Sequence, residues 1–192
     1  MATLDTGLCL CFFFLFLTQV VVGLDPVNQV NFKVPLAYPK FDQCDPAWAN
    51  DMMADKTVCK VGCLMTSVSM AIRYYNITIN NKEATPGILN QWLRTNGGYD
   101  NESDLYEPAL DKLSNKIKYI GKQKELMWSD IVDNLNNGTV TIANVKHGKH
   151  FVLMVGYTEP VSDSWLVNDP YPPFNQTVYT TDEIVGYRVF TM

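Results

Sequence analysis

Residues 139–169 read TVTIANVKHGKHFVLMVGYTEPVSDSWLVND, three runs of β-branched and aromatic residues separated by turn-forming residues. These runs predict strands over 139–146, 150–157 and 164–169, and GYRVFT predicts a last strand over 186–191. We expect the strands to pair antiparallel, because short turns rather than long crossovers connect the first three.

The part of the chain that precedes these strands has helical periodicity. Apolar residues at helical spacing predict a helix over 62–75, and a second helix over 85–98 opens with Thr-Pro and closes with Gly-Gly. Shorter helices are expected near 104–113 and 128–135, and a short edge strand over 30–35. Helices followed by antiparallel strands indicate an α+β fold with the helices packed on the sheet.

The N-terminus has the pattern of a secretory signal peptide. Residues 8–22 read LCLCFFFLFLTQVVV, and the small residue Gly23 follows. The segment before this run lacks Lys and Arg and carries Asp5, which departs from the usual pattern. An uncleaved membrane anchor is the alternative, but the run is shorter than the ~20 residues that a bilayer requires. We therefore predict a signal peptide over 1–23, a single domain over 24–192, and no stable membrane insertion after cleavage.

Four Asn-X-Ser/Thr sequons also favour export. An N-glycan is added to such a site only in the lumen of the secretory pathway. Together with the signal peptide, the sequons predict a secreted or endolysosomal glycoprotein. The acceptor residues are Asn76, Asn101, Asn137 and Asn175.

Charge excludes some partners. The chain has 15 Lys and Arg against 20 Asp and Glu, a net charge of -5, and no basic run or stripe. Nucleic acid and anionic membrane surfaces are therefore poor partners. We expect a monomer without a cofactor.

The cysteine count predicts one disulfide and one free thiol. Removal of the signal peptide leaves Cys44, Cys59 and Cys63, an odd number in an oxidising compartment. Cys59 and Cys63 could form the bridge, but Cys63 opens a helix, whereas the other two lie in or next to a polar loop. We infer a Cys44–Cys59 disulfide. Zinc is the metal alternative, but the usual second pair of ligands is missing.

The position of Cys63 suggests a nucleophile. A cysteine at a helix N-terminus faces unpaired backbone N–H groups and the positive end of the helix dipole, and both favour thiolate over thiol. The alternative is a small buried hydrophobic residue, a common role for a free cysteine.

His150 and Asp169 are the candidate partners of the thiol. His150 begins a predicted strand, where its ring can reach the edge of a cleft. If Tyr157 faces Ser164 across the hairpin, Asp169 is a diagonal neighbour of His150 on one face of the sheet. Asn168 would point to the other face, although a single bulge would reverse the choice.

Gln43 is a candidate donor to an oxyanion. Its amide lies upstream of Cys63, and an amide N–H can stabilise the negative oxygen of a tetrahedral intermediate together with the backbone N–H of Cys63. Gln43, Cys63, His150 and Asp169 would then act as oxyanion donor, nucleophile, general acid/base and orienting acid.

The sequence resembles a known family, the peptidase family thirty-nine-like domains. These domains are papain-like relatives of the bacteriocin-processing, double-glycine-leader peptidases. The resemblance covers nearly the whole mature chain. It is carried by PLAYPKFDQCDPAW (35–48), VGCLMTSVSMAIRYY (61–75), TPGILNQWLRTNGGY (85–99), KHFVLMVGY (149–157) and WLVNDP (165–170).

The resemblance implies a papain-like cysteine peptidase fold and thiol acyl-transfer chemistry. By motif, Gln43 matches the oxyanion glutamine, Cys63 the nucleophile, His150 the base and Asp169 the orienting acid. The separation of Gln43 from Cys63 is longer than in compact papain-type sites. The leader-processing members are fused to transporters and no transporter segment is present here, so leader specificity does not transfer.

Two classes of function follow from these residues. The first is a cysteine peptidase that hydrolyses peptide or amide bonds through an acyl-enzyme, with a thiol amidase or transpeptidase as a variant. The second is a binding protein on the same scaffold with an idle site. Retention of all four residues favours the enzyme, whose partner would be a peptide or protein substrate.

Overall fold

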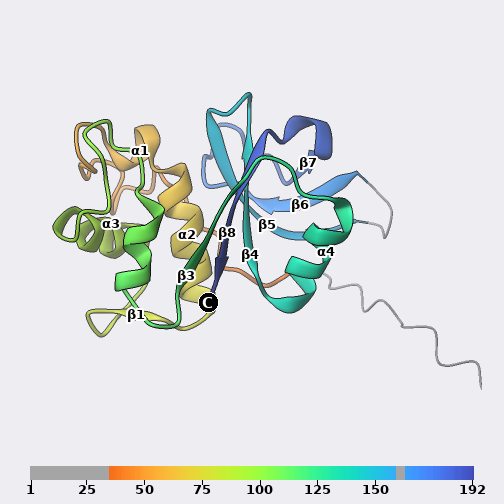
Figure 1. Cartoon of the computed structure of the whole chain (residues 1–192). Coiled ribbons are helices and arrows are strands. Elements are labelled where there is room, and N and C mark those ends of the chain that lie inside the picture. The colour runs from red at the N-terminus through yellow and green to blue at the C-terminus, as the bar shows by residue number, and fades with distance from the viewer. Residues whose placement is uncertain (1–34, 159–162) are drawn as a thin grey trace, which may run out of the picture. The chain divides into compact units, whose positions relative to one another are not determined.

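The computed structural model describes residues 35–158 and 163–192 (Figure 1). The predicted signal peptide over 1–23 and residues 30–34 of the predicted edge strand lie outside these ranges. No helix in the described ranges is both long enough and apolar enough to cross a membrane.

The described residues form a mixture of helices and strands. The helices are α1 (Val58–Val61), α2 (Cys63–Tyr74), α3 (Pro86–Thr95) and α4 (Trp128–Asn137), with 3₁₀ helices η1 (Glu107–Lys112) and η2 (Thr181–Glu183). The strands are β1 (Thr78–Ile79), β2 (Lys82–Glu83), β3 (Lys118–Gln123), β4 (Val140–Val145), β5 (His150–Tyr157), β6 (Ser164–Asn168), β7 (Val178–Thr180) and β8 (Gly186–Thr191).

Six strands form one antiparallel sheet in the order β3-β8-β4-β5-β6-β7. The predicted α+β class is confirmed, and β4, β5, β6 and β8 lie where the sequence placed strands. Strands β3 and β7 of this sheet were not predicted, nor was the separate pair of two-residue strands β1 and β2. β3 reads KYIGKQ, has no fully buried residue and lies at the sheet edge, so its apolar signal is weak. β7 is only three residues long.

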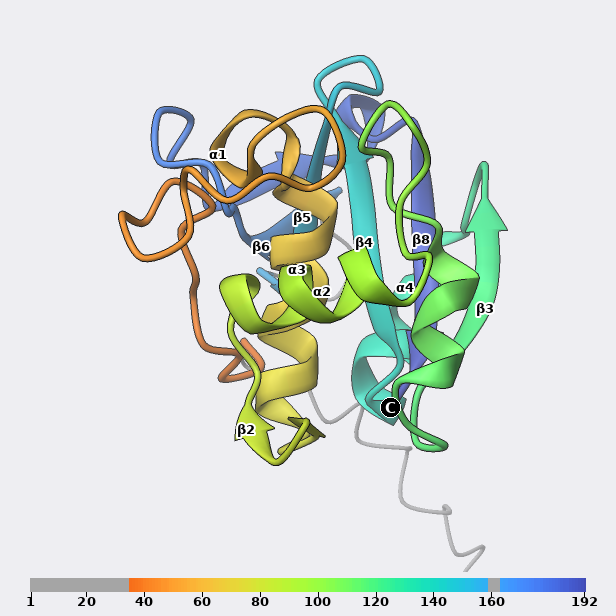
Figure 2. The same ribbon diagram turned by 90° about the vertical axis from the view of Figure 1, so that its left-hand side faces the viewer.

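The helix that carries Cys63 is more buried than its sequence suggests. The predicted apolar stripe describes one face, yet every residue from 63 to 72 is buried. Helix α2 packs against β4 and β5 on one side and contacts α3 on another (Figures 1 and 2). Its hydroxyl and methionine side chains are therefore also part of the interior.

Helices α3 and α4 follow their sequence signals closely, whereas the short helix α1 was not predicted. The side chain of Thr85 accepts a hydrogen bond from the backbone N–H of Ile88 at 3.3 Å, as expected of an N-cap residue. Helix α4 is capped at its C-terminus by Gly138, which has a φ of 75° and so adopts the left-handed conformation that glycine accepts readily. The predicted helix over 104–113 is the shorter 3₁₀ helix η1.

The β5–β6 hairpin decides which residues face the site. Leu153 pairs with Asn168, as the predicted register requires. Near the turn, however, Tyr157 pairs with Trp165 rather than with Ser164. The two pairings differ by one residue, so the strand must contain a bulge between them.

The bulge lies between Met154 and Gly156, and the segment at residues 35–36 contacts it. The backbone N–H of Leu36 donates to the carbonyl of Val155 at 2.7 Å. A Cβ on Gly156 would lie 3.2 Å from the Cα of Pro35, so glycine permits this close approach. Without the bulge, the register of the turn would place Asn168, not Asp169, on the face of His150.

Candidate active site

Cys63 is the first residue of α2, and Gly62 alone separates it from α1. It is the free cysteine of the described residues and is 9% exposed. Gly62 joins the two helices, and its N–H donates to the carbonyl of Val58 at 2.7 Å. A Cβ on Gly62 would lie 2.5 Å from that same oxygen, so glycine is needed before the cysteine. The tight joint fixes Cys63 at the start of the longer helix.

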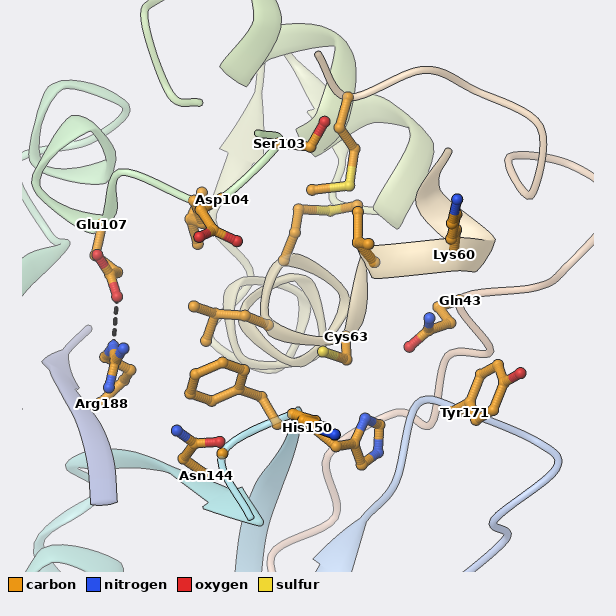
Figure 3. Close-up of a pocket in the computed structure, with 18 of the residues that line it drawn as sticks. Gln43, Lys60, Cys63, Ser103, Asp104, Glu107, Asn144, His150, Tyr171 and Arg188 are labelled. Atoms are coloured by element: carbon orange, nitrogen blue, oxygen red, sulfur yellow. Dashed lines mark hydrogen bonds and ion pairs between the residues drawn. The ribbon is translucent and has the colours of Figure 1, made fainter. Parts of the chain in front are cut away.

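His150 lies at the beginning of β5 and contacts both other members of the predicted triad. Its Nε2 lies 2.7 Å from Oδ1 of Asp169, and its ring lies beside the Cys63 side chain, which contributes to the raised pKa of the imidazole (Figure 3). Since Nε2 faces the carboxylate, Nδ1 is the ring nitrogen left for the sulfur. His150 is 4% exposed, so water has little access to compete for these contacts.

Asp169 follows directly on β6 and is 1% exposed. In addition to His150, its Oδ1 accepts the backbone N–H of Tyr171 at 2.8 Å. Its Oδ2 accepts the hydroxyl of Tyr179 at 3.3 Å. Asn168 instead donates to the carbonyl of Tyr38 at 3.2 Å, so the structure places Asp169 rather than Asn168 next to the histidine.

Tyr179 was not found from the sequence. It lies on β7, which was not predicted, and it is fully buried. Burial, followed by the charge of Asp169, raises the pKa of the Tyr179 hydroxyl, so it remains a protonated donor. Tyr179 therefore fixes the carboxylate oxygen that His150 does not use.

The surroundings of His150 favour its protonated form. Burial alone lowers the pKa of its imidazole, but the hydrogen bonds to Asp169 and Cys63 and the charges of both groups act in the opposite direction. Together these effects raise the pKa of His150 from 6.5 to about 9. At neutral pH the ring is therefore a cation that can donate to both neighbours.

Gln43 lies beside the start of α1 and is 3% exposed. Its Nε2 donates to the carbonyl of Cys59 at 2.7 Å and lies 3.5 Å from that of Val58. Its Oε1 is buried and has no hydrogen-bond partner among the described residues. Figure 3 shows this oxygen, not the NH₂ group, on the side of the amide nearer Cys63.

The predicted disulfide is present. Cys44 and Cys59 are joined, with a Cα–Cα distance of 4.3 Å. Cys44 is adjacent in sequence to Gln43, and the carbonyl of Cys59 accepts the amide of Gln43, so the bridge closes the loop that holds this glutamine. Because the disulfide uses two of the three cysteines, these two sulfurs cannot bind a zinc ion, as the zinc alternative would require. In the part of the chain that the structure describes, no three His, Cys, Asp or Glu side chains are arranged to hold a metal ion.

Cys63 and His150 open onto a cleft of about 730 Å³ (Figure 3). Tyr171 and Phe174 form an aromatic wall next to the histidine, with ring centroids 6.2 and 5.1 Å from that of His150. Arg188 lies farther along the cleft, where its Nε donates to Glu107. No local sequence pattern predicts this ion pair, because strand β8 and helix η1 bring the two residues together only in the folded chain.

A known protein family matches most of the chain. The matching family is described as Peptidase_C39 like family, and the match covers residues 25–190. The chain belongs to this family. No curated protein and no solved structure matches it. Membership indicates a cysteine peptidase-like function for this family member, with peptides or proteins as the corresponding class of substrate.

The four sequon asparagines are all exposed: Asn76, Asn101, Asn137 and Asn175. Each could carry a glycan without disturbing the interior.

Proposed function

We propose that this C39-like protein is a papain-like cysteine peptidase in which Cys63 forms an acyl-enzyme with its substrate. The observation that carries the proposal is the position of His150, which contacts the free thiol on one side and a buried carboxylate on the other. Nucleophile, base and orienting acid in this order are the arrangement that thiol catalysis requires. Helix α2 packed on the sheet also agrees with a papain-like fold.

In the first half-reaction, the Cys63 sulfur attacks the carbonyl carbon of the scissile amide, and the carbonyl oxygen becomes an oxyanion. The C–N bond then breaks, and His150 gives its proton to the departing nitrogen. The product is an amine, and the acyl group remains on sulfur as a thioester. Asp169 keeps the imidazole oriented and stabilises its charge throughout.

In the second half-reaction, neutral His150 takes a proton from water as the oxygen attacks the thioester. The C–S bond breaks, and the acid product leaves. Cys63 is again a thiolate and His150 again an imidazolium, so the cycle closes without a cofactor step. The net reaction is hydrolysis of one amide bond.

The oxyanion would be held by the backbone N–H of Cys63 and by Gln43. Nε2 of Gln43 uses one hydrogen for the carbonyl of Cys59, while its contact with Val58, at 3.5 Å, is at the limit of a hydrogen bond. Because Oε1 faces Cys63, the amide of Gln43 would rotate and release the carbonyl of Cys59 in order to donate to the negative oxygen. Loss of one such donor lowers kcat about 10²–10³-fold, the effect we expect for Gln43→Ala.

We also propose that the protein acts in the secretory pathway, as a secreted or endolysosomal glycoprotein. The Cys44–Cys59 disulfide supports this, because such bonds persist in oxidising compartments. The exposure of the four sequon asparagines supports it as well. Expression in a eukaryotic secretory host followed by glycosidase treatment tests the idea, and an unchanged mass with retained N-terminal residues would contradict it.

Alkylation and turnover together test the catalytic proposal. The full-length protein is treated with iodoacetamide at mildly acidic pH, and the modified peptide is located by mass spectrometry. We expect rapid modification of Cys63, because a thiolate reacts and a buried neutral thiol does not. The same protein and its Cys63→Ala variant are then incubated with a mixed peptide library.

Cleavage by the unaltered protein that Cys63→Ala abolishes would support the proposal. An inert thiol and an unchanged library would indicate an idle binding protein. Full activity of Cys63→Ala would show that another residue is the nucleophile. His150→Ala is the matched variant for the alkylation step, because it keeps the thiol and removes its partner.

A further inference from the structure

One end of the cleft contains a buried guanidinium with unused donors. Arg188 is 9% exposed and lines the cleft. Its Nε donates to Glu107, and its Nη1 donates to the carbonyl of Tyr187 at 3.3 Å. A guanidinium has five N–H donors, so three of them have no partner among the described residues. The cation also lies over the ring of Phe151, 5.0 Å from the centroid, which fixes its plane.

The groups around Arg188 extend this polar wall. Lys122 pairs directly with Arg188 across β3 and β8, so both side chains lie on the same face of the sheet. Asn144 also lines the cleft, and its Oδ1 is buried without a hydrogen-bond partner. Figure 3 shows Asn144 and Arg188 at the same end of the cleft, beside Glu107. The free N–H groups of Arg188 need a hydrogen-bond acceptor from outside the protein, whereas the Oδ1 of Asn144 needs a donor.

The charge of the cleft is opposite to that of the chain. The whole protein carries 20 acidic and 15 basic residues. The cleft is lined by four basic residues and two acidic ones: Lys60, Lys122, Lys149 and Arg188 against Asp104 and Glu107. Glu107 is already paired with Arg188, and the three lysines have no ion-pair partner among the described residues. The cleft therefore attracts anions in spite of the net charge of -5.

We propose that this end of the cleft, formed by Arg188, Lys122 and Asn144, binds a carboxylate of the substrate. The inference rests on the proposed function and specifies it: the preferred substrates are peptides with an acidic group at a fixed distance from the cleaved bond. The free N–H groups of Arg188 match the two oxygens of a carboxylate. Lys122 adds positive charge, and the amide of Asn144 donates a further N–H. The carboxylate comes either from a Glu or Asp side chain or from the C-terminus of the peptide.

Paired peptides test the proposal on the unaltered protein. A set of internally quenched peptides carries Glu or Gln at each position around the cleaved bond, and each peptide is made with a free and an amidated C-terminus. We expect one position at which Glu raises kcat/KM about ten- to a hundredfold over Gln, the factor that charge-assisted hydrogen bonds supply. A preference for the free C-terminus instead identifies the terminal carboxylate as the source.

Variants then connect the preference to the residues. Arg188→Lys keeps a cation beside Glu107 but loses the planar pair of donors, so the Glu/Gln ratio should fall toward one. Lys122→Gln should reduce the ratio about two- to fivefold, and more at low ionic strength. Lys116→Gln removes an exposed lysine that does not line the cleft, and it should leave the ratio unchanged.

The two proposals can fail separately. If no peptide is cleaved, the peptidase function is wrong and the carboxylate inference is lost with it. If peptides are cleaved with equal kcat/KM whether they carry Glu, Gln, an acid or an amide, the peptidase stands and the carboxylate site is refuted. Should Arg188→Lys fail to fold, the peptide pairs and Lys122→Gln still decide the question.

Discussion

Replacement of Asp169 by Asn is the sharpest test of the site, because it removes one charge and almost no volume. Asp169 is 1% exposed, and its Oδ1 lies 2.7 Å from Nε2 of His150. Its hydrogen bond and its charge are two of the four effects that raise the pKa of His150 to about 9. Asn can keep a hydrogen bond to Tyr179 or to the backbone, but it carries no charge.

The size of the effect follows from these contacts. A neighbouring opposite charge shifts a pKa by about 1–3, and the burial that lowers the pKa of His150 remains in the variant. We therefore expect the pKa of His150 to fall from about 9 to between about 6 and 8. At pH 8 the protonated fraction would drop from about 0.9 to about 0.1 if the pKa fell to about 7. Activity that needs the imidazolium should fall about tenfold from this cause alone.

Proton NMR provides the direct measurement. The chain has only two histidines, so His150 and His147 give a simple spectrum. His147 is exposed and serves as the internal reference. The alkaline limb of kcat/KM should move to lower pH together with the titration of His150. An unchanged titration near pH 9 in Asp169→Asn would refute the reasoning, since the carboxylate would not be responsible for the raised pKa.

The same shift has a consequence for stability. The folded pKa of His150 is raised above its ordinary value, so the stabilisation is fully present below about pH 6.5 and is lost as the pH rises through about 9. The free energy of unfolding should therefore decrease with rising pH across this window in the unaltered protein. In Asp169→Asn this dependence should be weaker, which urea unfolding at several pH values measures.

Other substitutions test the supporting structure. Tyr179→Phe removes the 3.3 Å hydrogen bond to Asp169, and it should lower kcat more than it raises KM. In urea unfolding it should also cost about 0.5–1.5 kcal/mol of stability. An unchanged kcat would show that this hydroxyl does not position the carboxylate. Replacement of Cys44 and Cys59 by Ser opens a loop of sequence separation 15 and should cost about 3 kcal/mol in denaturant unfolding, and a loss near zero would contradict this. Gly62→Ala forces a Cβ against a carbonyl oxygen at 2.5 Å, so thermal unfolding should show a loss of about 1–3 kcal/mol; a fully stable variant would mean that the joint can relax.

Local sequence signals were sufficient to predict many of the residues at the candidate active site. The free thiol followed from the odd number of cysteines and from the position of Cys63 at a helix start. The pairing of Cys44 with Cys59 followed from their place in one polar segment, and the structure contains it. The strand that begins at His150 followed from a run of β-branched residues. These features depend on neighbours in sequence, where propensity and spacing are informative.

The choice of Asp169 was reached from the sequence, but on an incomplete premise. The hairpin turn does not set the register at the site, because the bulge between Met154 and Gly156 shifts it by one residue. That bulge is held by a backbone contact from Leu36, which lies far away in the sequence. The bulge places the aspartate, and not the asparagine, on the face of the histidine, and the packing of the 35–36 segment against β5 stabilises it.

The tertiary structure alone brought in the remaining residues. Tyr179 reaches Asp169 from a three-residue strand whose sequence is too short to be distinctive. Glu107 and Arg188 meet although 81 positions separate them, because η1 packs beside β3, the neighbour of β8. No local pattern records such contacts, since propensity describes a segment and the cleft is built from several. The sequence thus determined which side chains are available for thiol chemistry, whereas the packing of distant segments decided how these side chains are held and which groups line the cleft.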